Sequence, residues 1–303
     1  ERTIAGRIEK NSTEIPIHLD KAKKFEKIWI VACGTAYHAG LFGKDLFEKV
    51  LGVPVSVELA SEFRYREPII GKNDLAIVIS QSGETMDTIA ATELLKENGS
   101  HVLALVNVVG SSLARMADSV FYLHVGPEIG VASTKAYLGM LVGQLLLAKH
   151  WDSNNKLDTS LEEIKALPSL IEEALKCEDQ VKQISKLIYK KKDIYFIGRG
   201  LDYALAAEGA LKLKEISYLH AEALAAGELK HGTLALIEEG TPVIVTASQR
   251  HLLDKTTSNV QEVIARGAYV IAVGDVSSKK LKDISNNYTV SYTHLRAHET
   301  VSD

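Results

Sequence analysis

The chain has 303 residues, of which 46% are apolar and 24% charged, a composition typical of folded globular proteins. Its formal charge of −4, from 35 basic and 39 acidic residues, excludes a global electrostatic attraction to nucleic acid or to an anionic membrane. Two cysteines are too few for a disulfide framework or a cysteine metal site, which indicates a reducing, cytoplasmic compartment. At about 150 residues per domain, the length predicts two domains.

The apolar stretches do not predict a membrane protein. The longest helix-like apolar stretch, residues 136–148, is too short to cross a bilayer and contains Gln144. The N-terminus lacks a basic segment followed by an apolar one, so no signal peptide is predicted. Because the first residue is Glu1 and not Met, we expect further sequence upstream.

Short apolar runs alternate with amphipathic segments along the chain, which predicts buried parallel strands joined by helices. The first half predicts strands over 28–32, 76–80 and 102–105, a helix from about Tyr37 and a long helix over 132–150. A polar boundary follows at 152–160 and a helical segment at 161–192. The second half predicts strands over 194–197, 242–246 and 270–273, and a helix from Tyr203.

The two halves repeat one pattern. The first two strand pairs are separated by 166 residues and the third by 168, and a helix ending in glycine, Gly99 or Gly267, precedes each third strand. We therefore predict an α/β fold with two doubly wound parallel sheets, helices on both faces, related by internal duplication. The expected boundaries are a lead-in at 1–24, a first subdomain at 25–152, a helical linker at 153–192, a truncated second subdomain at 193–290 and a tail at 291–303.

The loop 80–85, Ser-Gln-Ser-Gly-Glu-Thr, joins a predicted strand to a helix at the edge where doubly wound folds bind ligands. Its hydroxyls and the N–H groups of the helix N-terminus favour an anion. It lacks the lysine of a nucleotide P-loop, so a phosphate monoester suits it better than a nucleoside triphosphate. The alternative is ordinary N-capping by Ser82, but the equivalent loop 246–251 lacks the glycine and the clustered hydroxyls.

The loop after the first strand reaches the same edge of the predicted sheet. Thr35 and its neighbouring N–H groups would extend the anion site. Cys33, at the end of a buried strand, is more typical of a small apolar filler than of a nucleophile.

The second half supplies acid–base candidates. Glu208, Lys212 and Glu215 share one face of a predicted helix, where a solvated ion-pair ladder is the alternative interpretation. His231 lies between glycines in a predicted mobile turn, although a single histidine is more often structural. Moving a proton between adjacent sugar carbons needs a carboxylate, and opening a sugar ring needs an acid–base group; Glu215 and His231 suit these tasks. The histidines of the two predicted subdomains have no paired spacing, so no metal site is predicted.

Six motifs in order resemble the sugar-isomerase (SIS) domain of the glutamine:fructose-6-phosphate amidotransferase, or glucosamine-6-phosphate synthase, family. The resemblance covers about residues 4–290. The motifs lie at 33–35, 61–66, 80–85, 128–136, 208–222 and 227–232.

This resemblance implies two flavodoxin-like subdomains that bind fructose 6-phosphate without a cofactor. In this family Glu215 shuttles the proton between C1 and C2, Lys212 lies beside it, and His231 opens the ring from across a homodimer interface. Ala36 departs from the serine that members often carry. The residues implied to bind substrate are Thr35, Ser80, Gln81, Ser82 and Thr85 around the phosphate, with Val131 and Ser133 at the sugar.

The expected overall reaction makes glucosamine 6-phosphate from fructose 6-phosphate and ammonia in the cytoplasm. The ammonia would come from a glutaminase domain upstream, and the family's Schiff-base lysine would lie in a C-terminal tail that residues 291–303 do not resemble, so we interpret this tail as non-native. A non-catalytic sugar-phosphate sensor and a related phosphosugar isomerase or deglycase remain alternatives. The first 24 residues are too few for a helix-turn-helix domain, which disfavours a DNA-binding regulator.

Overall fold

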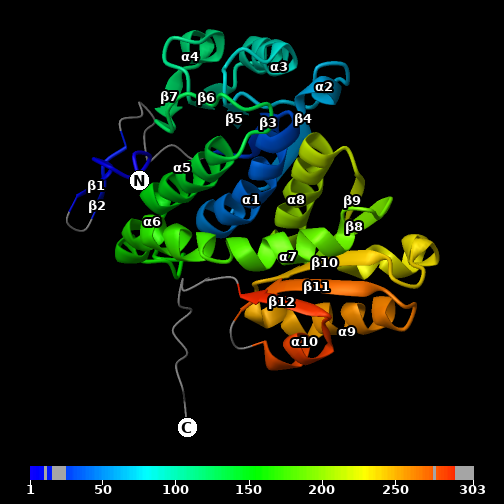
Figure 1. Ribbon diagram of the computed structural model, residues 1–303. Helices are drawn as coiled ribbons and strands as arrows, with labels where there is room; N and C mark the ends of the chain where they lie inside the picture. The colour runs from blue at the N-terminus through cyan, green and yellow to red at the C-terminus, as the bar shows by residue number, and fades with distance from the viewer. Residues whose placement is uncertain (10–11, 16–24, 276–277, 291–303) are drawn as a thin grey trace. The chain divides into compact units, whose positions relative to one another are not determined.

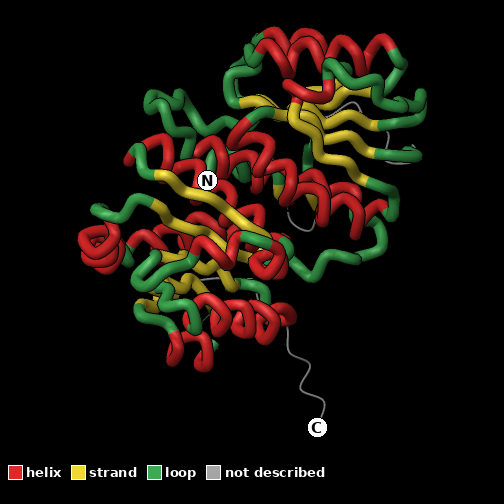
Figure 2. Tube along the Cα trace, turned by 90° about the vertical axis from the view of Figure 1, so that its right-hand side faces the viewer, coloured by secondary structure: helices red, strands yellow, loops and turns green. Residues whose placement is uncertain are grey.

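The chain forms two compact units, Glu1–Lys165 and Ala166–Asp303, each built on a five-stranded parallel sheet (Figure 1). The structure is a computed structural model that describes residues 1–9, 12–15, 25–275 and 278–290. The predicted tail at 291–303 and residues 10–11 and 16–24 of the predicted lead-in therefore lie outside the described residues. Figure 2 shows helices covering both faces of the strand layer in each unit.

The sheet of the first unit has the order β4-β3-β5-β6-β7 with all strands parallel, which is the flavodoxin-like order 2-1-3-4-5. A short antiparallel pair, β1 and β2, precedes it. The strands are β1 (Ile8–Glu9), β2 (Ser12–Thr13), β3 (Ile28–Ala32), β4 (Val55–Leu59), β5 (Leu75–Ser80), β6 (His101–Val106) and β7 (Ser119–Tyr122). The helices are α1 (Gly34–Leu51), α2 (Ala60–Phe63), α3 (Met86–Glu97), α4 (Ser112–Met116) and α5 (Lys135–Trp151).

The second unit repeats this topology with the order β9-β8-β10-β11-β12, again parallel throughout. Its strands are β8 (Asp193–Gly198), β9 (His220–Ala225), β10 (Pro242–Ala247), β11 (Tyr269–Gly274) and β12 (Asn287–Val290). The remaining elements are α6 (Leu161–Leu175), α7 (Glu178–Ile188), α8 (Leu201–Ser217), α9 (Leu253–Ile264), α10 (Lys279–Ile284) and the 3-10 helices η1 (Ala226–His231), η2 (Thr233–Leu236) and η3 (Arg250–Leu252).

Burial on both faces explains the continuous apolar strands. Every residue of β3 and β5 is buried, because α3 and α4 cover one face of the first sheet and α1 and α5 the other (Figure 1). In the second unit, α9 and α10 pack on one face, and α7 and α8 on the other. The doubly wound, duplicated α/β prediction is therefore confirmed.

The six predicted strands are all present, and Gly99 and Gly267 follow α3 and α9 with φ of +84° and +87°. The prediction missed β4, β7, β9 and β12, which lie toward the edges of the sheets and are too short or too mixed to form an apolar run. The helices predicted from about 37 and from about 132 are both present, and each starts three residues from the predicted position, α1 at Gly34 and α5 at Lys135.

The chain around His231 is more ordered in form than an open turn. Residues 226–231 form the 3-10 helix η1, with Ala226 and Leu229 buried against the core of the second unit, and a turn follows at Gly232. In the described part of the chain, no helix combines the length and apolar character needed to cross a membrane.

The pairing of α1 with α5 depends on a close approach at Gly43. Gln144 of α5 is fully buried, and its amide nitrogen donates to the carbonyl oxygens of Ala39 at 2.8 Å and Met140 at 3.2 Å. A Cβ at Gly43 would lie 1.8 Å from the Gln144 side-chain oxygen. Only glycine therefore allows this helix contact.

Gly43→Ala should destabilise the first unit by about 1–3 kcal/mol, because the added methyl group overpacks the buried amide. Both tryptophans, Trp29 and Trp151, lie in this unit, so denaturant unfolding followed by tryptophan fluorescence reports on it. Asp45→Ala, an exposed change in the same helix, is the control and should stay within about 0.5 kcal/mol of the parent. Equal midpoints for the two variants would contradict the close approach.

Candidate functional site

A hollow of about 210 Å³ opens at the carboxyl ends of β3 and β5 in the first unit. This volume is below the roughly 300–1,000 Å³ of sites for drug-sized ligands, so the hollow suits a small polar group. Its lining residues are Cys33, Thr35, Ala36, Ile79, Ser80, Gln81, Ser82, Thr85, Ser133 and Met140.

The hydroxyls of the loop 80–85 are fixed by short contacts within the loop. Ser80 Oγ accepts a hydrogen bond from the Gly83 N–H at 3.0 Å and lies 3.1 Å from Thr85 Oγ1. Ser82 Oγ accepts from the Glu84 N–H at 3.1 Å. The loop leads into α3, so hydroxyls and a helix N-terminus meet beside the hollow, an arrangement that favours an anion.

The outer side of this loop is anchored to the start of α4. The Gly83 carbonyl oxygen accepts from the Leu113 N–H at 3.1 Å, and Glu84 Oε1 accepts from the Ser112 N–H at 2.8 Å. Hydrogen bonds from the side chain and backbone of Ser112 lower the pKa of the Glu84 carboxyl below its ordinary value. Exposed Glu84 therefore serves to hold the loop, and it does not line the hollow.

The structure separates the two residues predicted to lie at the sugar. Ser133 lines the hollow, and its Oγ lies 3.5 Å from Glu128 Oε2, which also accepts from the Ala136 N–H at 2.9 Å. Val131 is fully exposed and is not among the lining residues. Six of the seven predicted substrate-binding residues thus share one hollow.

In the second unit, α8 brings the predicted charged residues onto one face. Lys212 Nζ lies 2.5 Å from Glu215 Oε2 and 3.5 Å from Glu208 Oε1. The side chains of Glu208, Lys212 and Glu215 are 5%, 17% and 30% exposed, respectively. The triad is therefore largely buried, unlike a solvated ladder, and Glu215 is its most accessible carboxylate.

His231 ends η1 at an exposed position, followed by Gly232 with φ of +135°. Its neighbour Lys230 forms an ion pair of 2.9 Å with Glu262 of α9. The imidazole is accordingly presented at the surface of the second unit.

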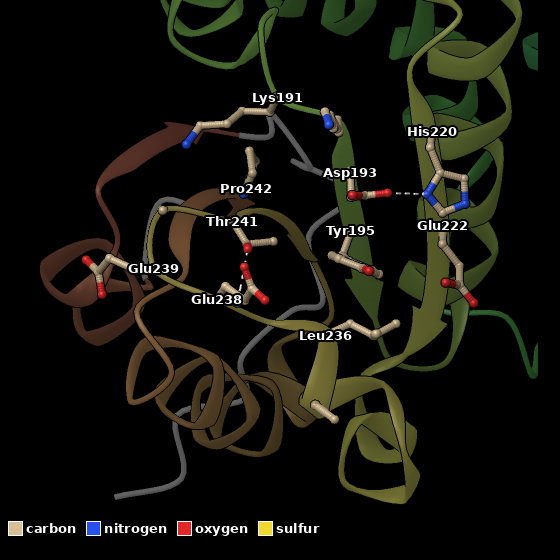
Figure 3. A pocket seen from close by; sticks show the side chains of 13 residues that line it. Lys191, Asp193, Tyr195, His220, Glu222, Leu236, Glu238, Glu239, Thr241 and Pro242 are labelled. Carbon is tan, nitrogen blue, oxygen red and sulfur yellow. Dashed lines mark hydrogen bonds and ion pairs between the residues drawn. The ribbon is translucent and has the colours of Figure 1, made fainter.

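A second hollow of about 450 Å³ lies at the opposite, amino edge of β8, β9 and β10 (Figure 3). His220 and Asp193, on the neighbouring strands β9 and β8, pair on one side of it at 2.8 Å (Figure 3), and burial together with the charges of Asp193 and Glu222 raises the pKa of Tyr195. None of the predicted site residues line this hollow. Its residues come from the starts of these strands, from the loops that precede them and from η2, at the edge opposite to the one where doubly wound folds bind ligands.

Sequence reasoning missed Met140, which reaches the hollow beside the loop 80–85 from α5, and gave no role to Ala36. Met140 belongs to an apolar helix pattern that does not reveal which neighbour it meets. Among the described residues, no group of three or more histidine, cysteine, aspartate or glutamate side chains is placed to hold a metal ion.

Comparison with known proteins places this pair of sheets in a defined class. The SIS domain family matches residues 21–149 and 187–291, more than half of the chain. A solved structure titled the C-terminal domain of glucosamine-fructose-6-phosphate aminotransferase from Francisella tularensis is 41% identical, with a TM-score of 0.87 over 95% of this chain and 84% of that one.

Two curated relatives, from Clostridium tetani and Clostridium acetobutylicum, are both named glutamine–fructose-6-phosphate aminotransferase (isomerizing). The first is 52% identical over 88% of this chain and 45% of its own length, and the second is 50% identical over 93% and 47%. The chain belongs to the SIS domain family and, within it, to the isomerase domains of these aminotransferases. It spans about half the length of the curated relatives it matches.

Gly83→Ala should lower the stability of the first unit by more than the cost of placing alanine in a left-handed conformation. Gly83 has φ of +67°, and a Cβ there would lie 2.1 Å from Ser111 Oγ. Gly110 has φ of +72° with open space around it, so Gly110→Ala carries only the conformational cost of about 1–2 kcal/mol. Tryptophan-monitored unfolding should give Gly83→Ala about 1–3 kcal/mol of additional destabilisation. The same loss in both variants would contradict the close packing of the loop on Ser111.

Proposed function

We propose that the chain is the isomerase part of an enzyme that converts fructose 6-phosphate and ammonia into glucosamine 6-phosphate and water. The observation that supports this most directly is the hollow in which Thr35, Ser80, Gln81, Ser82 and Thr85 converge beside the start of α3. Hydroxyl donors and a helix N-terminus suit a phosphate monoester. The names of the relatives supply the reaction.

The proposed chemistry divides between the two units. The loop 80–85 binds the phosphate and fixes the sugar, with Ser133 and Val131 nearer the sugar carbons. Ammonia adds to C2 of the open ketose with loss of water, after which Glu215 removes a proton from C1 and returns it to C2. Lys212, in contact with Glu215, orients the carboxylate and compensates its charge. His231 exchanges protons with the ring oxygen to open the sugar.

The proposed enzyme also includes a glutaminase domain, a second subunit and defined subdomain boundaries. A glutaminase domain upstream would supply the ammonia, in keeping with the names of relatives about twice as long. A homodimer would complete each site by donating His231, and the enzyme would work in the cytoplasm. The subdomain boundaries 25–152 and 193–290, with a linker between them and a non-native tail after residue 290, belong to the same proposal.

Two variants should separate binding from turnover. Thr85→Val removes one phosphate donor and should weaken fructose 6-phosphate binding by about 10- to 100-fold, measured by calorimetry. Glu215→Gln should bind normally but lose about 10²- to 10⁴-fold in formation of glucose 6-phosphate, or of glucosamine 6-phosphate with ammonium present. Glu172→Gln, exposed on α6, is the matched control and should change neither quantity.

Turnover unaffected by Glu215→Gln would overturn the role of this carboxylate. Absence of fructose 6-phosphate binding by the parent chain would overturn the phosphate site. A sensor function would instead give binding and thermal stabilisation without turnover, in a protein extended to the length of the relatives and supplied with ammonium.

The proposed sharing of sites between subunits predicts complementation. Glu215→Gln and His231→Ala proteins are each inactive, but a mixed dimer contains one site with both native residues. Because half of randomly mixed dimers are heterodimers with one intact site, refolding the two together should restore about 25% of parent activity. Activity that remains at background in a mixture shown to exchange subunits would contradict donation of His231 across the dimer.

A further inference from the structure

The duplicated fold allows the two units to be compared position by position at the carboxyl edge of each sheet. Gly34 and Gly200 stand at the start of α1 and α8, 166 residues apart, and both have φ of +54°. Counted from these glycines, Ala36 corresponds to Asp202. Trp29 pairs with Ala76, and the equivalent Tyr195 pairs with Val243, so the loop after β10 lies one residue further along and Ser248 corresponds to Gln81. The loop 246–251 is therefore the second copy of the loop that lines the phosphate hollow.

The two copies differ in what stands before the loop. Ala36 lines the hollow of the first unit with a side chain that ends at Cβ. Asp202 of α8 is only 2% exposed, and its carboxylate reaches the second loop. It accepts hydrogen bonds from Ser248 Oγ at 2.6 Å, from the Ser248 N–H at 3.0 Å and from the Gln249 N–H at 3.3 Å.

A fourth contact joins the Gln249 side-chain nitrogen to Asp202 Oδ2 at 3.4 Å. A hydroxyl, successive backbone N–H groups and an amide thus converge on one carboxylate. These are donor types that hold oxyanions in phosphate sites. The first turn of α8 adds the positive end of a 17-residue helix.

We infer that the second unit retains the anion-binding site of the duplicated fold and fills it with the carboxylate of its own Asp202. Because the Asp202 carboxylate is part of the chain, it occupies these donors at any ligand concentration and excludes a phosphate monoester from this loop. The inference rests on the proposed phosphate role of the loop 80–85. Under it, each chain binds one sugar phosphate, and Asp202 is the residue that prevents a second from binding.

The neighbouring ion pair is consistent with a filled site. Arg250, in the same loop, lies 3.6 Å from Asp275, whose side chain is 5% exposed. The guanidinium therefore pairs with a carboxylate other than that of Asp202. Removing Asp202 leaves the donors of Ser248 and Gln249 without their carboxylate partner, which favours an incoming anion.

Reciprocal exchange of the two corresponding residues tests this inference. Asp202→Ala gives the second unit the residue of the first, and Ala36→Asp does the reverse. Equilibrium dialysis with labelled inorganic phosphate should find one site per parent chain, two in Asp202→Ala, none in Ala36→Asp and one in the double variant. Asp254→Ala, which removes an exposed carboxylate from the first turn of α9, controls for net charge and should keep one site.

The outcomes distinguish this inference from the proposed function. A parent chain that binds no phosphate overturns the proposed phosphate role of the loop 80–85. One site in the parent and still one in folded Asp202→Ala overturns the filled second site. If Asp202→Ala is poorly folded, its melting temperature is measured at increasing phosphate concentration and compared with that of the isosteric Asp202→Asn. A rise confined to Asp202→Ala supports the inference, and equal responses contradict it.

Discussion

The structure depends on how hydrogen-bond donors are satisfied at the carboxyl edge of each parallel sheet. Here the strands end, loops turn into helices, and N–H groups and hydroxyls converge with the positive ends of helix dipoles. Donors in such a place need an acceptor, because a buried donor without one costs free energy. In the first unit the hydroxyl-rich loop surrounds a hollow, and in the second the carboxylate of Asp202 accepts from the corresponding loop.

This difference gives two copies of one fold separate roles. Under the proposed function, a filled donor site leaves the second unit without a phosphate position, and its chemistry would reside instead on α8, where Lys212 contacts both Glu208 and Glu215. Burial of Glu208 requires a nearby cation, since an unpaired buried carboxylate is strongly unfavourable. The same lysine also contacts the more exposed Glu215, so under the proposed function the pairing that stabilises α8 would also orient the base.

The loop 80–85 keeps its shape through packing that is separate from its donors. Gly83 lies against Ser111, while Glu84 binds the start of α4. Beneath the same edge, the contact of Gly43 with Gln144 sets the approach of α5 to α1, and Met140 of α5 lines the hollow. The size of the hollow therefore depends on helix packing as well as on the loop sequence.

The sequence by itself determined the central strands, the duplication, the hydroxyl-rich loop and the shared face of Glu208, Lys212 and Glu215, because each is a local pattern with a fixed period or spacing. The tertiary structure alone decided the rest. The edge strands β4 and β9 lack the continuous apolar run of a central strand, and η1 is held by Ala226 and Leu229 against the core. Asp202 meets Ser248 across 46 residues of chain, and Met140 meets the phosphate loop across a comparable distance. Contacts between such distant residues produce no periodic pattern in the sequence, because they form only when the helices pack on the sheet.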